Sequence, residues 1–69
     1  MYSVIVKEED MVVARSILDG LAEAVSFGRE ESQEGNSITI YEAVQDSSGY
    51  ILHTHKVLSI IMPKETPYV

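Results

Sequence analysis

Two histidines separated by one residue, His53 and His55, are the strongest candidates for chemistry in this 69-residue sequence. Alternate residues of a β-strand point to the same side, so a strand would direct both imidazoles one way. Glu42 or Tyr41, on a neighbouring strand, could supply a further metal ligand. Zinc sites need three or four ligands, however, and the sequence has no cysteine and only two histidines. We therefore predict no cofactor and no metal site within one chain, and keep a site shared between chains at His53 and His55 as an alternative.

A serine nucleophile is a second candidate, because Ser47 and Ser48 precede His53 and lie near Asp46 and Glu42 in the sequence. The glycine pattern of a nucleophile elbow does not accompany these serines, and nothing indicates an oxyanion hole. Serines in turns usually form local hydrogen bonds. The glycines of the chain also fit neither a Walker nor a Rossmann spacing. We predict that the protein is not an enzyme.

The charge is unevenly distributed along the chain. The net charge is −6, and eight of the eleven carboxylates lie within residues 1–34. Nucleic-acid binding depends on Lys and Arg, so we expect no direct binding to nucleic acid. No apolar run approaches the roughly 20 residues that span a bilayer, and no basic amphipathic stretch favours a membrane surface. Without cysteine, the disulfide framework of small secreted domains is excluded, and we expect a cytoplasmic protein.

A strand at residues 2–7 and a helix at residues 8–27 are predicted for the first half of the chain. The strand is rich in β-branched residues. Acidic residues at the start of the helix would be favoured by the helix dipole. Apolar residues recur at α-helical spacing and form one helix face: Ala14, Ile17, Leu18, Leu21, Ala22 and Val25.

Two glycines have different predicted roles in this helix. Gly20 lies inside it and is interpreted as a point where the helix approaches the sheet closely. Gly28 is interpreted as the residue that follows the helix and ends it. The polar residues 29–37 then predict a mobile loop.

A hairpin is predicted for the second half, with strands at residues 37–45 and 50–62. Asp46 and Gly49 fit the first and fourth positions of a type I turn. Gly49 in the left-handed conformation would complete a three-residue loop with a bulge. The element order βαββ predicts an α+β fold, with one helix packed on a three-stranded, mostly antiparallel sheet.

The length of this loop also predicts which residues of the two strands face each other. The expected pairs are Val44 with Leu52, Glu42 with Thr54, and Ile38 with Leu58. The face toward the helix would hold Ile38, Ile40, Val44, Leu52, Leu58 and Ile60. The reverse face would hold Tyr41, Ala43, Ile51, His53, His55, Val57 and Ile61. A loop of two or four residues would exchange the faces of the last strand.

A chain of this length forms one domain at most. We expect residues 1–63 to form it and residues 64–69 to be an extended C-terminal tail. One helix covers one face of a sheet, so the reverse face would remain uncovered, and uncovered apolar faces often mark interfaces. Without disulfides or a metal, a small domain commonly gains stability from a partner or from a second copy, so a homodimer is also expected.

These observations predict a small, acidic, non-enzymatic protein-binding domain with a regulatory or inhibitory role. Its size and charge are similar to those of small inhibitors that phages and mobile elements encode against basic or nucleic-acid-binding host proteins. The predicted acidic contact surface comprises Glu8, Glu9, Asp10, Asp19, Glu23, Glu30, Glu31 and Glu34. The predicted contact residues of the sheet face are Tyr41, Ile51, His53, His55 and Val57. The alternative is a homo-oligomeric subunit with a shared metal or catalytic site at His53 and His55.

Overall fold

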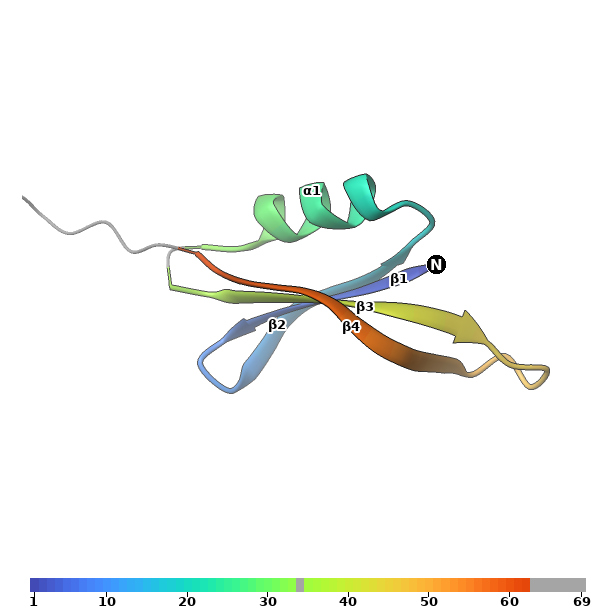
Figure 1. Cartoon of the computed structure of the whole chain (residues 1–69). Coiled ribbons are helices and arrows are strands. Elements are labelled where there is room, and N and C mark those ends of the chain that lie inside the picture. The colour runs from blue at the N-terminus through green and yellow to red at the C-terminus, as the bar shows by residue number, and fades with distance from the viewer. Residues whose placement is uncertain (34, 63–69) are drawn as a thin grey trace, which may run out of the picture.

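Four strands and one helix make up the fold over the residues that the structure describes. The structure, a computed structural model, describes residues 1–33 and 35–62, so the predicted tail at residues 64–69 lies outside the described part. The elements follow the order β1 (Tyr2–Glu8), β2 (Met11–Leu18), α1 (Leu21–Glu31), β3 (Ser37–Gln45) and β4 (Ile51–Ile61). The strands form one antiparallel sheet in the order β2-β1-β3-β4, with α1 on one side (Figure 1). The predicted α+β class is confirmed.

The prediction of three strands is wrong, because residues 11–18 form the strand β2 and not the first half of a helix. Ala14 and Leu18 lie four residues apart, a spacing that suits one helix face and also one strand face. In the structure they pair with Val6 and Tyr2 of β1, on the side toward α1. The helix begins only at Leu21, so Glu8 ends β1, and Glu9 and Asp10 form the turn between β1 and β2.

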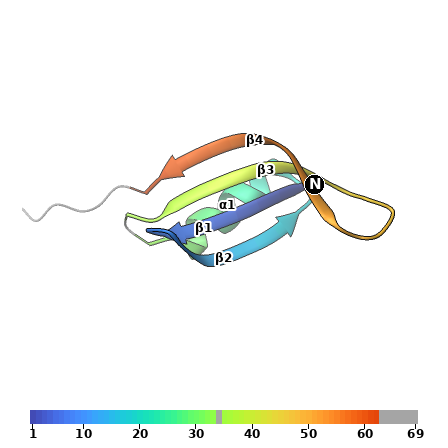
Figure 2. The same cartoon turned by 90° about the horizontal axis from the view of Figure 1, so that it is seen from below.

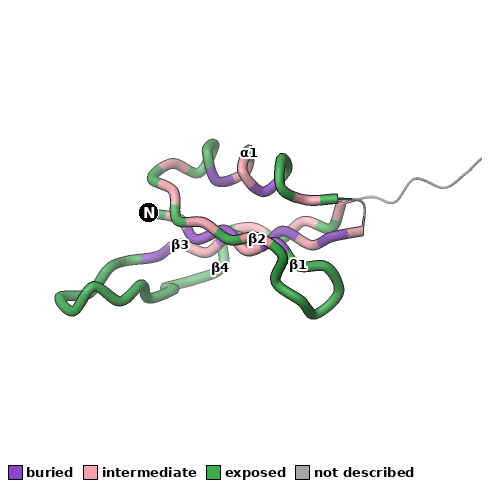
Figure 3. Tube along the Cα trace, turned by 180° about the vertical axis from the view of Figure 1, so that it is seen from behind, coloured by how far each residue is buried: buried purple, intermediate pink, exposed green. Residues whose placement is uncertain are grey.

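The core lies between α1 and the two central strands of the sheet. Its buried side chains come from β1, β3 and α1: Val4, Val6, Ala24, Ile38 and Ile40. Because α1 packs mainly on β1, β2 and β3, almost all of β4 is exposed. The buried positions lie on α1 and in the middle of the sheet, whereas the β1–β2 turn and the end of the β3–β4 hairpin are exposed (Figure 3).

Neither glycine has the role predicted for it. Gly20 precedes α1 as its N-cap residue, with extended backbone angles. Gly28 lies inside the helix, which continues to Glu31 and shortens the predicted loop. A Cβ atom at Gly28 would lie 2.6 Å from Cγ2 of the buried Ile38. The close approach of helix and sheet therefore occurs at Gly28.

The β3–β4 hairpin has the predicted turn but not the full predicted register. Gly49 has a φ angle of 90°, and the Asp46 carboxylate accepts hydrogen bonds from the backbone N–H groups of Ser48 and Tyr50. The predicted pairing of Val44 with Leu52 is confirmed.

Farther from the turn, two register shifts change the pairing of the hairpin. Glu42 faces His55, and Ile38 faces Ile60, instead of the predicted Thr54 and Leu58. Each shift inserts one extra residue in β4, first Thr54 and then Val57. A bulge of this kind changes the side to which the following residues point.

The β1–β2 turn contains a strained residue, and this leads to a prediction about stability. Glu9 has a φ angle of 56°, in the left-handed region that non-glycine residues avoid. We expect Glu9→Gly to raise the free energy of unfolding by about 1 kcal/mol. Asp10→Gly removes the same charge at a residue without a positive φ and is expected to be neutral or destabilising. Urea denaturation of the two variants measures the difference, and an equal gain in both would mean that charge repulsion is the cause.

Candidate functional site

The two histidines lie on opposite faces of the sheet, so the prediction that they project together is wrong. Nε2 of His55 lies 3.1 Å from Oε2 of Glu42, its partner on β3. His53 stacks on Tyr41, with ring centroids 4.5 Å apart and an interplanar angle of 7°. Tyr41 and Glu42 are consecutive in β3 and therefore point to opposite faces. The bulge at Thr54 is the physical reason, because Thr54 is an extra residue between the two histidines, whose pairing partners Ala43 and Glu42 are consecutive in β3.

A metal site has little support within the described part of the chain. In residues 1–33 and 35–62, no three His, Cys, Asp or Glu side chains gather closely enough to hold a metal ion. Glu42 and His55 form a pair on one side of the sheet, and His53 contacts Ser3 on the other. The geometry therefore separates the two imidazoles of one chain.

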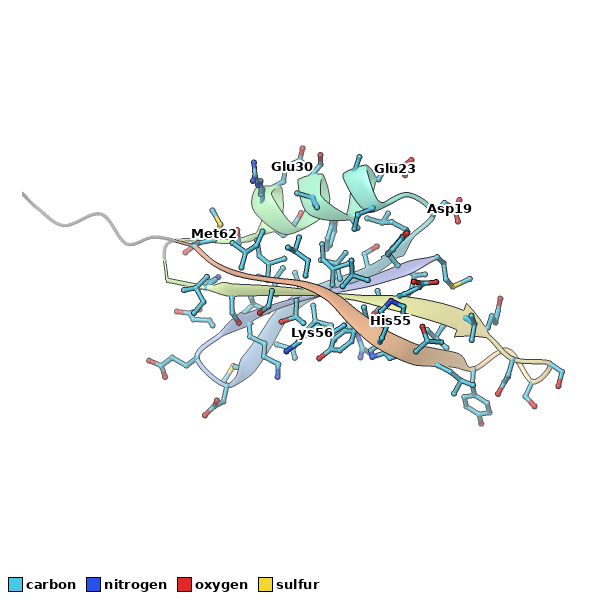
Figure 4. The ribbon with its side chains drawn as sticks, viewed as in Figure 1. Asp19, Glu23, Glu30, His55, Lys56 and Met62 are labelled. Carbon is cyan, nitrogen blue, oxygen red and sulfur yellow. The ribbon has the colours of Figure 1, made fainter. Side chains whose placement is uncertain are left out.

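The predicted acidic contact residues form two separate groups. Glu8, Glu9 and Asp10 lie at the β1–β2 turn, which bends away from α1 (Figure 1). The other described carboxylates belong to α1 or directly precede it, and we call them the acidic helix surface: Asp19, Glu23, Glu30 and Glu31. Glu34 lies outside the described residues. Glu23 and Glu30 project from α1 away from the sheet, and Asp19 points outward from the loop that precedes α1 (Figure 4).

The helix spacing explains this arrangement. Glu23 and Glu30 are seven residues apart, close to two full turns, so their side chains leave α1 in nearly the same direction. All four carboxylates are exposed. The helix contains one basic residue, Arg29, in its last turn. Four of the eight predicted acidic contact residues therefore lie together on or next to α1, as the acidic helix surface.

The opposite side of the sheet, which we call the open face, carries the basic residues of the strands. The four strands lie wholly in the described part of the chain and contain Lys7, Arg15 and Lys56. Lys7 follows Val6, which is buried toward α1, so the Lys7 side chain points to the other face. Arg15 pairs with Ile5, which precedes Val6, so Arg15 also points away from α1. Lys56 faces Tyr41 and points away from the helix (Figure 4). Arg15 lies on this face because residues 11–18 form a strand and not part of a helix.

The open face is concave because the sheet curls. The beginning of β4 bends back below the first residues of β1 (Figure 2), and Nε2 of His53 lies 3.0 Å from Oγ of the buried Ser3 on β1. A hollow of about 610 Å³ lies there between β1, β2 and the start of β4. We call it the open-face hollow, and its lining residues are Ser3, Ile5, Arg15, Ser16, Ile17, Tyr50, Ile51 and His53.

Three of the five predicted sheet-face residues therefore lie together. Tyr41 and His53 form the stacked pair, and Ile51 lines the hollow beside His53. His55 lies on the helix side, and Val57 is the extra residue of a bulge. Arg15, Ser3 and Tyr50 were not predicted as site residues, because the curl of the sheet that brings them together has no signal in the sequence.

Comparisons with known proteins found no similarity: no family model, no curated protein and no solved structure matches this chain. Within the described residues, no helix is long and apolar enough to cross a membrane. Any function has to be argued from the two faces themselves.

Proposed function

We propose that this chain is a small non-enzymatic protein-binding domain that docks its acidic helix surface on a basic surface of a partner protein. The observation that carries the proposal is the shared direction of Glu23 and Glu30 on the exposed side of α1, with Asp19 beside them (Figure 4). Carboxylates in a row on a rigid helix are well suited to pair with the Lys and Arg side chains of a partner.

The placement of the opposite charges supports an oriented encounter. The four carboxylates of the acidic helix surface lie on the helix side, whereas Lys7, Arg15 and Lys56 alternate to the open face. A basic partner is attracted to one side of the molecule and repelled from the other. Such charge asymmetry speeds association and selects the docking orientation.

A regulatory or inhibitory role follows from the chemistry of such a partner. Basic protein surfaces often bind phosphate backbones, and a row of carboxylates competes for the same Lys and Arg side chains. The helix would then block the partner's nucleic-acid site without itself binding nucleic acid. A cytoplasmic location, as the composition predicts, would give access to such proteins.

A metal or catalytic site shared between chains at His53 and His55 stays the alternative, and metal titration of the unmodified chain tests it. Because the two imidazoles lie on opposite faces of the sheet, one face of a chain would contribute one histidine to such a site. A homo-oligomer without such a site stays a prediction that sedimentation measurements test.

The double substitution Glu23→Lys and Glu30→Lys tests the proposal. A basic partner is first captured with the unmodified chain from the native host and identified, and its association rate is then measured at several salt concentrations. We expect the double variant to associate at least about tenfold more slowly at low salt, and its rate to depend less on salt.

The matched control is Glu8→Lys with Glu9→Lys, which makes the same charge change at the β1–β2 turn. We expect this control to keep most of the association rate, because the turn bends away from α1 (Figure 1). Equal losses in both double variants would show that net charge alone governs binding. Unchanged rates in the helix variant would refute docking through the acidic helix surface.

A further inference from the structure

We propose that the open-face hollow binds a small organic carboxylate with an apolar or aromatic body, and that the Arg15 guanidinium holds the carboxylate. This site lies on the side of the sheet opposite α1, so it is independent of the proposed docking surface. The inference depends on one juxtaposition: Arg15 lies beside three isoleucines in the open-face hollow. The two edge strands of the sheet, β2 and β4, both border this hollow.

The size and walls of the hollow fit a small ligand. Its volume of about 610 Å³ lies within the roughly 300–1,000 Å³ of small-molecule sites. Ile5, Ile17 and Ile51 supply apolar walls from three different strands. Ile17 is 43% exposed and Ile51 37% exposed, so an apolar ligand would remove accessible apolar surface from water.

The charge of the hollow favours an anion. Arg15 lines it, and among the described residues no carboxylate does. A guanidinium offers two parallel N–H donors that match the two oxygens of a carboxylate. In a protein with a net charge of −6, such a surface is where an anion meets least repulsion from the protein's own carboxylates.

Contacts with Tyr41 and Ser3 order His53, one of the residues that line the hollow. His53 is stacked on Tyr41 and contacts Oγ of Ser3, so two interactions fix its ring. Tyr50, which is exposed and carries a hydroxyl group on its ring, also lines the hollow. A wall that is ordered before the ligand arrives lowers the entropy cost of binding.

The probes are indole acetate and its neutral amide, indole acetamide, which have nearly the same shape. Each is titrated into the full chain labelled with nitrogen-15, and amide chemical shifts are followed by NMR. We expect indole acetate to bind with a dissociation constant of about a millimolar. Its largest shifts are expected at Ile5, Arg15, Ile17 and Ile51, and the amide is expected to bind about fivefold more weakly.

Arg15→Gln is the decisive variant, and Arg29→Gln is its matched control. Arg15 is exposed, so its replacement leaves the core intact, and the undisturbed shifts of core amides verify this. We expect Arg15→Gln to lower the affinity for indole acetate about fivefold, to that of the amide, and Arg29→Gln to leave it unchanged.

Three results would overturn the inference. They are equal binding of the acid and the amide, equal effects of the two arginine substitutions, and shifts scattered over the surface. The Glu23→Lys and Glu30→Lys variant separates this inference from the proposed function. If the carboxylate site is real, that variant binds indole acetate as the unmodified chain does, whether or not the acidic helix surface docks on a partner.

Discussion

Replacement of Ile40 by alanine is expected to remove most of the stability of this protein. Ile40 is fully buried on the central strand β3, where it packs in the core beneath α1. Truncation of a buried isoleucine costs about 2–5 kcal/mol, because apolar contact is lost and a cavity remains. A domain of 69 residues has a total free energy of unfolding of roughly 3–10 kcal/mol. The variant should therefore lose a large share of its free energy of unfolding.

Urea denaturation followed by circular dichroism measures this loss. Ile61→Ala is the matched control, since it makes the same chemical change at a residue that is 75% exposed. We expect the control to lose less than about 1 kcal/mol. Similar losses in the two variants would mean that the core does not lie between α1 and the central strands.

Replacement of Gly28 by alanine is expected to destabilise the protein, although alanine is the better helix former. The new Cβ atom would lie 2.6 Å from Cγ2 of Ile38, which is itself 1% exposed and has no free space to move into. Overpacking of this kind costs about 1–3 kcal/mol. The gain in helix propensity of about 1 kcal/mol offsets part of that cost. We expect a net loss of up to about 2 kcal/mol in thermal or urea denaturation.

Gly20→Ser is the contrasting substitution. Gly20 is the N-cap residue, has an extended backbone, and has no backbone atom close to an added Cβ. A serine hydroxyl at an N-cap accepts a hydrogen bond from a free N–H group of the first turn. We therefore expect a gain of a few tenths of a kcal/mol. If Gly28→Ala proved stabilising instead, the helix would have to stand farther from the sheet than it does here.

The second half of the fold could be predicted from the sequence because its signals are local. Asp46 and Gly49 determine the turn through their own backbone and side-chain hydrogen bonds. The register next to the turn, Val44 opposite Leu52, follows from the loop length. The two bulges in β4 could not be predicted, because an extra residue in a strand depends on how the twisted partner strand is placed.

The first half of the fold was predicted wrongly because its apolar residues fit both the helical and the strand periodicity. Ala14 and Leu18 suit a helix and a strand equally, and the Glu9–Asp10 turn has neither glycine nor asparagine to mark it. β2 is an edge strand with apolar residues on both faces, so it lacks a clean alternation. Its pairing with β1 decided the outcome, and only the folded chain contains that contact.

The sequence by itself determined the α+β class, the acidic character and the turn at Asp46, since each depends on residues that are neighbours along the chain. The tertiary structure alone decided that His53 and His55 face apart, that Arg15 lines a hollow, and that the carboxylates of α1 and the strand cations lie on opposite sides. The physical reason is that the face on which a strand side chain lies depends on how that strand pairs with its neighbour, including any bulge and the curl of the sheet. A single shifted residue in such a pair sends a side chain to the other face.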